Sequence, residues 1–501
     1  MLQLEKLTIT HQKDLQDLIR DLDLVLNPGE KLAIIGEEGT GKSSLIKAIA
    51  APQMLSSYAQ LSGKITNHFH QFGYLPQALE NKELQLTVMD FLYRDLDYGL
   101  FDFNLFYQYA DQFGLDLDRF DAQNQTLASL SGGEKLKVQL LKILANDLDL
   151  LILDEPSSDL DLETLQWLEN FIQQSDKAIL FISHDESLLA RAATAILHLE
   201  LLKKRTEPRA TFYRGNYDQY RRERTEKFEH QLQVAKKERE EHAKKMERHH
   251  RIHQSVEHVL RHTHDSTAGR LLAKKMKNVL SQEKRLKKEA ENLTEIPQDM
   301  DAIQLFFSEI KPLPASKILL SWEKKLLPTG QTINLQIQGQ DKLVITGKNG
   351  IGKTRLLKLL LQDLLARPDL SVSYIPQHYE EEFENQDTPL SFLASVADEE
   401  KARTLLASLK FTRQEVVHSL HDLSGGQKAK LFLARMVLAG NDVLVLDEPT
   451  RHFSPTSLPL IRQLLMDYPG AIISVSHDRR FIEEVATIHY QLDEESLLRI
   501  R

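Results

Sequence analysis

The chain carries one set of sequence elements twice. Each copy begins with a glycine-rich loop, Gly36-Glu-Glu-Gly-Thr-Gly-Lys-Ser43 or Gly347-Lys-Asn-Gly-Ile-Gly-Lys-Thr354. Each continues with the sequence Leu-Ser-Gly-Gly and with an apolar run that ends in Asp-Glu-Pro. The same offset of 293 residues separates Asp154 from Asp447 and also separates the paired serines and histidines of the two copies. A constant offset indicates an internal duplication, so the 501 residues predict two similar domains rather than one large core.

Composition narrows the class of protein. The hydrophobic fraction of 41% suits ordinary globular interiors. The chain has no cysteine, which excludes disulfides, thiolate metal sites and cysteine catalysis. The start, Met1-Leu-Gln-Leu-Glu-Lys, lacks the basic region and apolar core of a signal peptide, and no run of about 18 apolar residues occurs. We therefore expect a cytoplasmic protein without membrane insertion.

The glycine-rich loops predict phosphate binding. Each follows a short apolar run and opens a helical pattern, which is the context that a phosphate loop needs. Glycines let backbone N–H groups turn around phosphate oxygens at a helix N-terminus. We expect the two lysines to reach the β- and γ-phosphates of ATP, and the hydroxyls that follow them to ligate Mg²⁺. A fortuitous glycine turn is the alternative, and two full matches argue against it. The predicted residues are Gly36, Gly39, Gly41, Lys42, Ser43 and Ser44, with Gly347, Gly350, Gly352, Lys353, Thr354 and Arg355 in the second loop.

Carboxylates follow two of the apolar runs. Short continuous apolar runs predict buried parallel strands, and a carboxylate at such a strand's end faces the ligand crevice of an open α/β sheet. Asp154 and Asp447 therefore suit Mg²⁺, mostly through water. Glu155 and Glu448 are placed to polarise the attacking water.

A histidine follows each of two further apolar runs. His184 and His477 each lie 29 residues after the glutamate of their copy. Such a histidine can hydrogen-bond the γ-phosphate and act in catalysis. The alternative is an ordinary polar residue at a strand end, but the equal spacing of the two copies favours function.

These motifs together resemble the ATP-binding cassette ATPases. The resemblance includes Gln77 and Gln377, which follow Tyr-Leu-Pro and Tyr-Ile-Pro, and it implies that both help to bind Mg²⁺. In that family two cassettes pair head to tail, and each nucleotide lies between one phosphate loop and the opposite Leu-Ser-Gly-Gly signature. One implied site joins Lys42, Gln77, Glu155 and His184 to Ser424, Gly425 and Gly426; the other joins Lys353, Gln377, Glu448 and His477 to Ser131, Gly132 and Gly133.

The second copy departs from the family pattern at one turn. Asp161 ends the acidic turn after the first Asp-Glu-Pro, whereas Ser454 stands at the equivalent position of the second copy. Because that turn touches the opposite site in the family, we expect unequal turnover at the two sites. The adenine-stacking residue is open: Trp322 is a candidate in the second copy and His11 in the first, and a buried core tryptophan is the alternative.

A basic helical spacer separates the two copies. Residues 221–290 hold 20 Lys and Arg against 11 Asp and Glu, a net charge of +9. Since the whole chain has a net charge of −10, the rest of the chain carries about −19. Apolar and histidine positions alternate in steps of three and four, which predicts an antiparallel coiled-coil hairpin with its turn at His262–Gly269. The predicted seam comprises Phe228, Leu232, Ala235, Arg239, His242, Met246, His249, His253, Val256 and Leu260, then Leu272, Met276, Val279, Leu286, Ala290 and Leu293.

The hairpin can be interpreted as a simple tether or as a nucleic-acid-binding element. It could be a solvated tether, but its length, its heptad order and its positive charge favour contact with phosphate-rich surfaces. No Phe, Tyr or Trp lies between Phe228 and Phe306, so we expect contacts to nucleic-acid backbone and shape rather than base stacking. The seam histidines favour a polar seam over a metal site, because no carboxylate-rich set accompanies them.

The whole pattern resembles the F subfamily of ATP-binding cassette proteins, which have two cassettes on one chain. We expect an α/β protein with P-loop domains at 1–213 and 306–501, and a linker at 214–305. The resemblance implies a monomer whose cassettes pair within the chain. It also implies that the linker contacts ribosomal RNA and tRNA near the exit site and is directed toward the peptidyl-transferase centre. From Lys42 to Gln77 is 35 residues against 24 in the second copy, too few extra residues for the arm of general translation factors. This favours the armless members, among which antibiotic-protection proteins are found.

Two other functions stay open. A transporter's energising ATPase would need a membrane partner on another chain, and the basic hairpin argues against it. A DNA-associated cassette ATPase usually carries much longer coiled coils within a cassette, or a zinc module that a chain without cysteine cannot build.

Overall fold

A computed structural model describes residues 1–13, 15–94, 96, 101–158, 160–202, 207–262, 266–294, 312–328, 330–383, 387–409 and 411–501. The chain forms two compact units: Met1–Asp218 with Met300–Arg501, and Gln219–Asp299. The first unit contains both copies of the duplicated sequence, and the second is the spacer. The predicted boundary at 306 lies outside the described residues. Arg214, predicted to open the linker, is instead the last residue of a strand.

The first cassette is built on a six-stranded sheet with the order β5-β6-β7-β3-β8-β9. Neighbours from β5 to β8 are parallel, and β9 pairs antiparallel with β8 at the edge. Buried aliphatic side chains on these strands and on the first helix form its core. The strands are β3 (Lys31–Ile35), β5 (Phe72–Leu75), β6 (Leu150–Asp154), β7 (Ala178–Ile182), β8 (Ala195–Leu201) and β9 (Glu207–Arg214).

Helices of the first cassette follow the strands. Several begin at a side-chain cap, as at Ser131, whose hydroxyl accepts the N–H of Glu134 in a capping box. The helices are α1 (Lys42–Ala50), α2 (Pro52–Leu55), α3 (Asn81–Leu84), α4 (Val88–Tyr93), α5 (Phe103–Gln112), α6 (Leu117–Ala122), α7 (Gly132–Leu144), α8 (Leu162–Gln174) and α9 (Glu186–Ala192), with a 3-10 turn η1 (Leu127–Ser129).

The second cassette repeats this topology. Its sheet has the order β13-β14-β15-β12-β16-β17, again parallel except for the last strand. The duplication in sequence is therefore a duplication of strand order and direction. The strands are β12 (Lys342–Gly347), β13 (Val372–Ile375), β14 (Val443–Asp447), β15 (Ala471–Val475), β16 (Ile488–Leu492) and β17 (Leu497–Arg499). The helices are α13 (Lys353–Leu365), α14 (Pro389–Leu393), α15 (Glu399–Ser408), α16 (Gly425–Ala439), α17 (Leu458–Met466) and α18 (Arg479–Glu484), with 3-10 turns η2 (Tyr379–Glu382) and η3 (Leu420–Asp422).

Each cassette also has a small antiparallel sheet. In the second cassette it consists of β10 (Ile318–Leu326) and β11 (Thr332–Gln338). In the first, β1 (Leu2–His11) and β2 (Asp17–Leu26) gain a third strand, β4 (Ala59–Asn67), which pairs with β1. The longer interval between Lys42 and Gln77 thus holds the short helix α2 and an edge strand, and no projecting arm.

Trp322 belongs to the core of the second cassette. Its side chain is 7% exposed, it packs with the aliphatic residues around β10 and β12, and its Nε1 donates to Asp363 Oδ2 at 2.8 Å. Of the two interpretations offered for this tryptophan, the buried-core one fits the structure.

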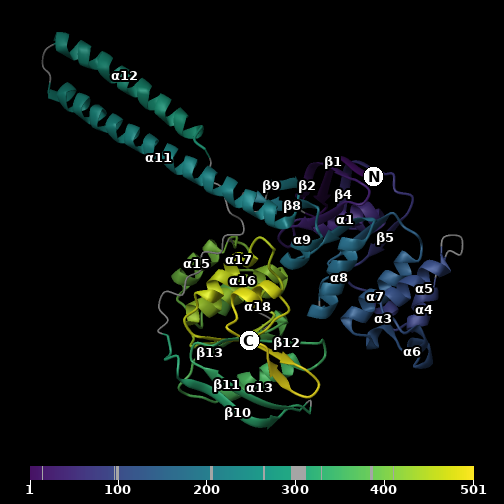
Figure 1. The fold of residues 1–501 in the computed structure, drawn as a ribbon. Coiled ribbons are helices and arrows are strands. Elements are labelled where there is room, and N and C mark those ends of the chain that lie inside the picture. Colours follow the sequence, from purple (N-terminus) through teal and green to yellow (C-terminus); the bar gives the residue numbers. More distant parts are fainter. Residues whose placement is uncertain are drawn as a thin grey trace. The chain divides into compact units, whose positions relative to one another are not determined.

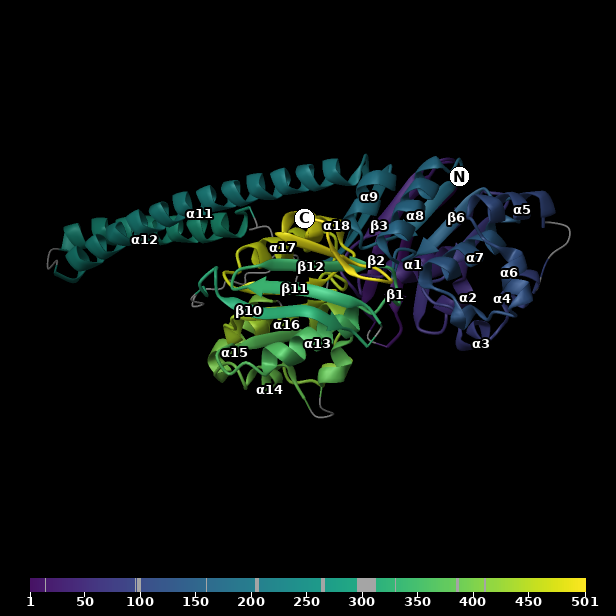
Figure 2. The ribbon, with the colours of Figure 1, turned by 60° about the horizontal axis from the view of Figure 1, so that its bottom comes forward.

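The second unit is an antiparallel helical hairpin. Helix α11 (Tyr217–His262) enters it, and α12 (Ser266–Glu291) returns alongside, as both views show (Figure 1, Figure 2). Residues 266–269 belong to α12 rather than to the predicted turn, because the helical hydrogen bonding resumes there; residues 263–265 lie outside the described residues. Arg239, predicted in the seam, is exposed, whereas the neighbouring Glu238 is partly exposed and accepts the Thr294 N–H at 2.7 Å.

The seam histidines bond to the opposite helix. His249 is 7% exposed and lies 2.8 Å from the Val279 carbonyl oxygen through Nε2, and His242 lies 2.9 Å from that of Leu286. A polar seam is therefore the better description. Among the described residues, no cluster of histidines and carboxylates suits a metal ion, and no helix is long and apolar enough to cross a membrane.

We expect Gly73→Ala to destabilise the first cassette. A Cβ at Gly73 in β5 would lie 2.1 Å from Ile143 Cγ2 on α7 and 2.8 Å from Leu148 Cδ2. Overpacking of this kind costs about 1–3 kcal/mol of unfolding free energy, which urea unfolding would show as a lower midpoint. Adding Ile143→Ala should cost less than the two separate losses combined, because the clash is removed. Strictly additive losses would contradict this packing.

Candidate nucleotide sites

Sheet topology brings the predicted chemistry together in each cassette. The phosphate loop follows β3, Asp154 ends β6, and His184 comes just after β7, which lies between those two strands. Carboxyl ends of parallel strands meet at one edge of a sheet, so the three elements converge there. The second cassette converges in the same way at the ends of β12, β14 and β15.

The phosphate loops need their glycines. Gly36 and Gly347 have φ of 149° and 151°, and a Cβ on either would lie 2.2 or 2.5 Å from the carbonyl oxygen of Leu199 or Leu492. Gly41 caps α1 in the left-handed region with φ 91°. No other residue type fits such close approach and such dihedrals without strain.

The loop lysines lie folded into their own loops. Lys42 Nζ donates to the carbonyl oxygens of Gly36 and Glu37 at 2.8 and 3.0 Å. Lys353 Nζ makes the same pair of bonds, to Gly347 and Lys348. Burial lowers the pKa of both lysines, against nearby carboxylates. A phosphate group would offer each lysine a charged partner in place of two neutral carbonyls.

The two serines that follow Lys42 have different surroundings. Ser43 Oγ donates to Asp154 Oδ1 at 3.3 Å, so the two predicted Mg²⁺-binding side chains are adjacent. Ser44 is buried and its hydroxyl lies 3.2 Å from Tyr58 Oη, which ties the start of α1 to the region before β4. In the second loop, Arg355 is exposed and lines the cavity described next.

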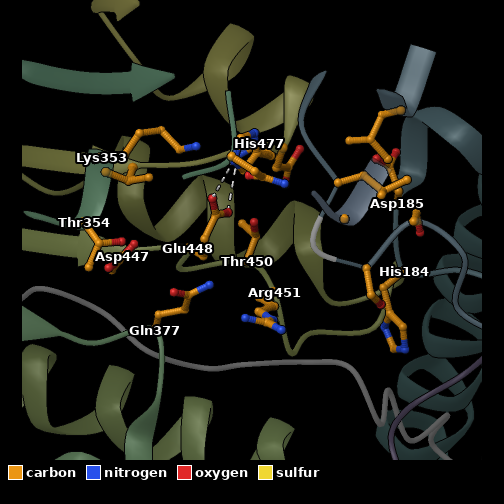
Figure 3. Close-up of a pocket in the computed structure, with 18 of the residues that line it drawn as sticks. His184, Asp185, Lys353, Thr354, Gln377, Asp447, Glu448, Thr450, Arg451 and His477 are labelled. Atoms are coloured by element: carbon orange, nitrogen blue, oxygen red, sulfur yellow. Dashed lines mark hydrogen bonds and ion pairs between the residues drawn. The ribbon is translucent and has the colours of Figure 1, made fainter. Parts of the chain in front are cut away.

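A cavity of about 800 Å³ opens at the second phosphate loop. Figure 3 shows Lys353, Thr354, Gln377, Asp447, Glu448 and His477 around it, with His184 and Asp185 of the first cassette across from them. Gly132, from the first signature, lines the same cavity; Ser131 and Gly133 do not. Ser131 instead caps α7, and Gly133 packs against Thr164. The structure thus brings one member of the first signature to the Lys353 site.

Burial dominates the electrostatics of this second site. It raises the pKa of Glu448 to about 8, helped by the charge of Asp447 and opposed by the backbone N–H of His477. It also raises the pKa of Asp447 and lowers that of His477 to about 4. Glu448 Oε1 and His477 Nδ1 are buried without a hydrogen-bond partner among the described residues. Buried carboxylates and unpartnered polar atoms beside a lysine fit a bound phosphate group and a divalent cation.

The first glutamate has a different environment. Burial would raise the pKa of Glu155, but the His184 side chain and the charge of Lys42 hold it below its usual value. Gln77 Nε2 donates to Glu155 Oε2 at 2.9 Å, and His184 Nε2 lies 3.5 Å from Oε1. Beside it, burial and the charge of Glu155 raise the pKa of Asp154 to about 6.

Both glutamates have unusual backbone geometry. Glu155 and Glu448 each have φ of 52°, in the left-handed region that costs a residue with a side chain about 1–3 kcal/mol. Residues held in this way cluster at functional sites. The repeated strain is consistent with the catalytic roles predicted for these two side chains.

The first phosphate loop faces the second signature. Gly426 N–H donates to Glu38 Oε2 at 2.9 Å, and the second signature residues Ser424 and Gly426 line a space of only about 10 Å³ with Glu37 and Glu38. Gly425 packs against the same side chain, since a Cβ added at Gly425 would lie 3.0 Å from Glu38 Oε1. The structure therefore pairs this signature with the Lys42 loop. Glu37 and Glu38 were not singled out from the sequence. Two acidic residues inside a loop predicted to bind phosphate are unusual, and this could have drawn attention to them.

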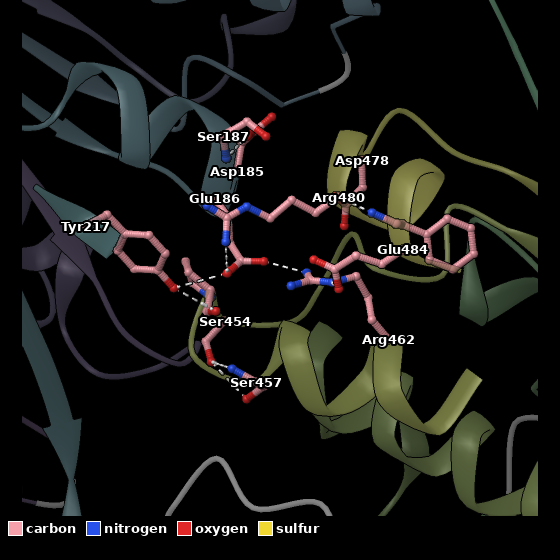
Figure 4. Close-up of polar contacts among 12 residues, drawn as sticks. Asp185, Glu186, Ser187, Tyr217, Ser454, Ser457, Arg462, Asp478, Arg480 and Glu484 are labelled. Carbon is pink, nitrogen blue, oxygen red and sulfur yellow. Dashed lines mark hydrogen bonds and ion pairs between the residues drawn. The ribbon is translucent and has the colours of Figure 1, made fainter. Parts of the chain in front are cut away.

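Buried ion pairs join the two cassettes. Arg462 in α17 pairs with Glu186 at the start of α9, and both side chains are 1% exposed. Figure 4 shows Glu186 between Arg462 and Tyr217, whose hydroxyl donates to the Pro455 carbonyl at 2.8 Å. Arg480 pairs with Glu186 at 3.4 Å and with Asp218 at 2.9 Å. The first residues of α11 thus contact the region that follows both histidines.

A family model described as ABC transporter matches residues 19–158 and 331–451, more than half of the chain. The chain belongs to the ATP-binding cassette family. Its cassettes bind ATP, and the protein is an ATPase.

The curated relatives place it in the F subfamily. It is 29% identical to the putative ATP-binding protein YdiF of Bacillus subtilis, over 94% of this chain and 77% of that one. It is 26% identical to ABC transporter F family member 5 of Arabidopsis thaliana, over 93% of this chain and 72% of that one. It is 26% identical to the probable ATP-binding protein YbiT of Escherichia coli O157:H7, over 96% of this chain and 94% of that one.

Solved structures share the fold. The complex of the archaeal ribosomal stalk protein aP1 with the archaeal ribosome recycling factor aABCE1 contains a chain that matches with a TM-score of 0.63 at 15% identity, over 99% of this chain and 90% of that one. The solved structure of an RNase-L inhibitor matches with a TM-score of 0.62 at 16% identity, over 99% of this chain and 91% of that one. The likeness confirms an α/β protein of two P-loop cassettes.

We expect the two glutamates to contribute unequally to ATP hydrolysis. Loss of a general base lowers rates by about 100-fold or more, and at the first site the Gly426 N–H of the second signature is already bonded to Glu38. Steady-state phosphate release should therefore fall further with Glu448→Gln than with Glu155→Gln. Identical residual rates in the two single variants would show that the sites are equivalent.

We expect Arg462→Met to be strongly destabilising. It leaves the buried Glu186 without its closest partner, which costs about 3–5 kcal/mol of unfolding free energy. The control is Arg191→Met, which removes an arginine that is 56% exposed and whose partner Glu169 keeps Arg479. Urea unfolding should show a large shift for Arg462→Met, a small one for the control, and partial recovery in Glu186→Gln/Arg462→Met. Equal shifts for both arginines would contradict the burial of this pair.

Proposed function

We propose that this ATPase is a cytoplasmic translation factor that binds the ribosome. ATP binding draws the cassettes together near the tRNA exit site, and the hairpin extends toward the peptidyl-transferase centre. Hydrolysis then permits release. The protein acts as a monomer, since one chain supplies both cassettes and both signatures.

The charge of the hairpin carries this proposal. Between Ser266 and Gln282, α12 has four cations and no acidic residue. Lys274, Lys275 and Lys277 are exposed and have no ion-pair partner among the described residues. A cationic rod without aromatic side chains suits the phosphate backbone of structured RNA, where counterion release drives binding.

The proposed chemistry is phosphoryl transfer to water at the cassette sites. Mg²⁺, when bound, supplies positive charge to the phosphates, and Ser43, Thr354, Gln77 and Gln377 are the side chains that would hold it. Lys42 and Lys353 would bind phosphate oxygens, and Asp154 and Asp447 would order the ion's water shell. Glu155 and Glu448 would orient the attacking water, with His184 and His477 beside them at 3.5 and 3.7 Å.

The contacts at the start of α11 support coupling between the cassettes and the hairpin. Tyr217 and Asp218 bond to residues of the second cassette that lie next to its histidine and its post-Asp-Glu-Pro turn. A change in cassette pairing would therefore reach the first turn of α11 directly. The structures of the same fold include a model of ribosome-bound archaeal Pelota and ABCE1, which is consistent with a ribosomal role. The armless first cassette extends the proposal to protection of the ribosome against antibiotics.

We expect ATP-dependent ribosome binding by the Glu155→Gln/Glu448→Gln variant. Blocking hydrolysis should hold the closed state, so the variant should co-sediment with ribosomes when ATP is present and not without nucleotide. If the variant binds ATP but does not co-sediment with ribosomes, the proposal of ribosome binding is wrong. A preference for duplex DNA or for membranes would point to the other two functions.

The contribution of the hairpin to ribosome binding is tested in the Glu155→Gln/Glu448→Gln variant. Lys274→Glu/Lys275→Glu/Lys277→Glu should weaken ATP-dependent retention and reduce its salt dependence. The control is Lys13→Glu/Lys64→Glu/Lys82→Glu, the same charge change on exposed lysines of the first cassette. Equal effects of the two triple variants would assign the binding to net charge rather than to the hairpin.

A further inference from the structure

The two phosphate loops differ at the residue that faces the opposite cassette. Glu38 in the first loop stands where Asn349 stands in the second. Glu38 Oε2 accepts the N–H of Gly426, the second residue of α16, at 2.9 Å. The first N–H groups of a helix have no partner within the helix and attract anions. Glu38 therefore acts as an anionic cap on the second signature helix.

Neighbouring charges hold this contact. Glu37 Oε1 lies 2.7 Å from Lys430 Nζ on α16, and the two side chains are only 17% and 9% exposed. His452 Nδ1 lies 3.6 Å from Glu38 Oε1. Burial would raise the pKa of Glu38, but His452 and the Gly426 N–H hold it at about 2, so the carboxylate is charged at neutral pH. Both acidic residues of the loop are thus paired with the opposite cassette.

The second site has the opposite arrangement of charge. There the acidic residue is on the turn: Asp161 is half-buried, and although burial would raise its pKa, the backbone N–H groups of Thr164 and Asn349 hold that pKa below the usual value. At the first site the turn offers His452 and Ser454, and the carboxylate comes from the loop. The absence of an acidic residue at position 454 is therefore matched by Glu38. Loop and turn remain paired at both sites, but the carboxylate is on the loop at the first site and on the turn at the second.

This exchange has a consequence for nucleotide binding. A phosphate between the Lys42 loop and the second signature needs the N–H groups that Glu38 now occupies. It would have to displace a charge-assisted hydrogen bond and would lie beside a carboxylate of the same sign. The Lys353 loop carries the neutral Asn349 at the equivalent position, and Asn349 lines the cavity of about 800 Å³ together with Glu155 and His184 of the first cassette.

We propose that Glu38 is a specificity-determining residue that weakens ATP binding at the first site, so that nucleotide exchange and turnover occur mainly at the Lys353 site. The first site then serves chiefly to hold the cassettes together. This inference concerns ATP binding by the isolated protein and stands whether or not the ribosome is its partner.

The test is an equilibrium titration of the full chain with a fluorescent ATP analogue and Mg²⁺ in the Glu155→Gln/Glu448→Gln background. Adding Lys353→Ala leaves the first site to be measured, and adding Lys42→Ala leaves the second. Glu38→Asn, which copies the second loop, should lower the Kd of the first site by about tenfold, the worth of one charge-assisted hydrogen bond. The Kd of the second site should change less than about twofold.

A matched control separates charge from position. Glu5→Gln removes one negative charge from the exposed face of β1 and should leave both Kd values unchanged. Unchanged affinity of the first site in Glu38→Asn would overturn the proposal, as would equal tightening at both sites or the same effect from Glu5→Gln. Should Glu38→Asn fail to fold, the isosteric Glu38→Gln gives the same test, and a first-site Kd that stays weak in it contradicts the proposal.

Discussion

Parallel pairing of three strands is the constraint on which each site depends. In the first cassette β7 lies between β3 and β6, so the loop, the Asp-Glu pair and the histidine emerge at neighbouring strand ends. Hydrogen bonds between neighbouring strands set the distance between the strands. The loop, the Asp-Glu pair and the histidine that follow these strands are therefore held at fixed positions. The second cassette repeats the order β14-β15-β12, so the same chemistry is assembled twice from one topology.

Charge pairs, rather than apolar contact alone, define how the cassettes face each other. The carboxylates of Glu186 and Glu169 are each only 1% exposed. Glu186 pairs with Arg462 and Glu169 pairs with Arg479, and both pairs join the two cassettes. The desolvation of such groups offsets much of their attraction, so their main effect is to favour one arrangement over others. Tyr217 and Asp218, the first residues of α11, join the same network.

The duplicated sites have diverged while keeping the residues that are predicted to be catalytic. Both glutamates line the same cavity, but burial raises the pKa of Glu448, whereas His184 and Lys42 hold the pKa of Glu155 below its usual value against burial. Glu38 and His452 replace the neutral loop residue and acidic turn of the other site. Equal sites would bind and release nucleotide together. Unequal ones allow one site to respond to ATP while the other keeps the cassettes in contact.

Much of the fold and of the candidate sites could be predicted from local sequence patterns. The loops, the carboxylate-bearing strands and the seam of the hairpin are set by neighbouring residues, since glycine dihedrals, apolar runs and heptads act over short distances. Other features depend on which surfaces meet. Glu38 bonds Gly426 across 388 residues, Glu186 bonds Arg462 across 276, and Trp322 is covered by helix α13 and its neighbours. Spacing along a chain does not encode such contacts, because burial and charge pairing arise only when packed elements exclude water between them.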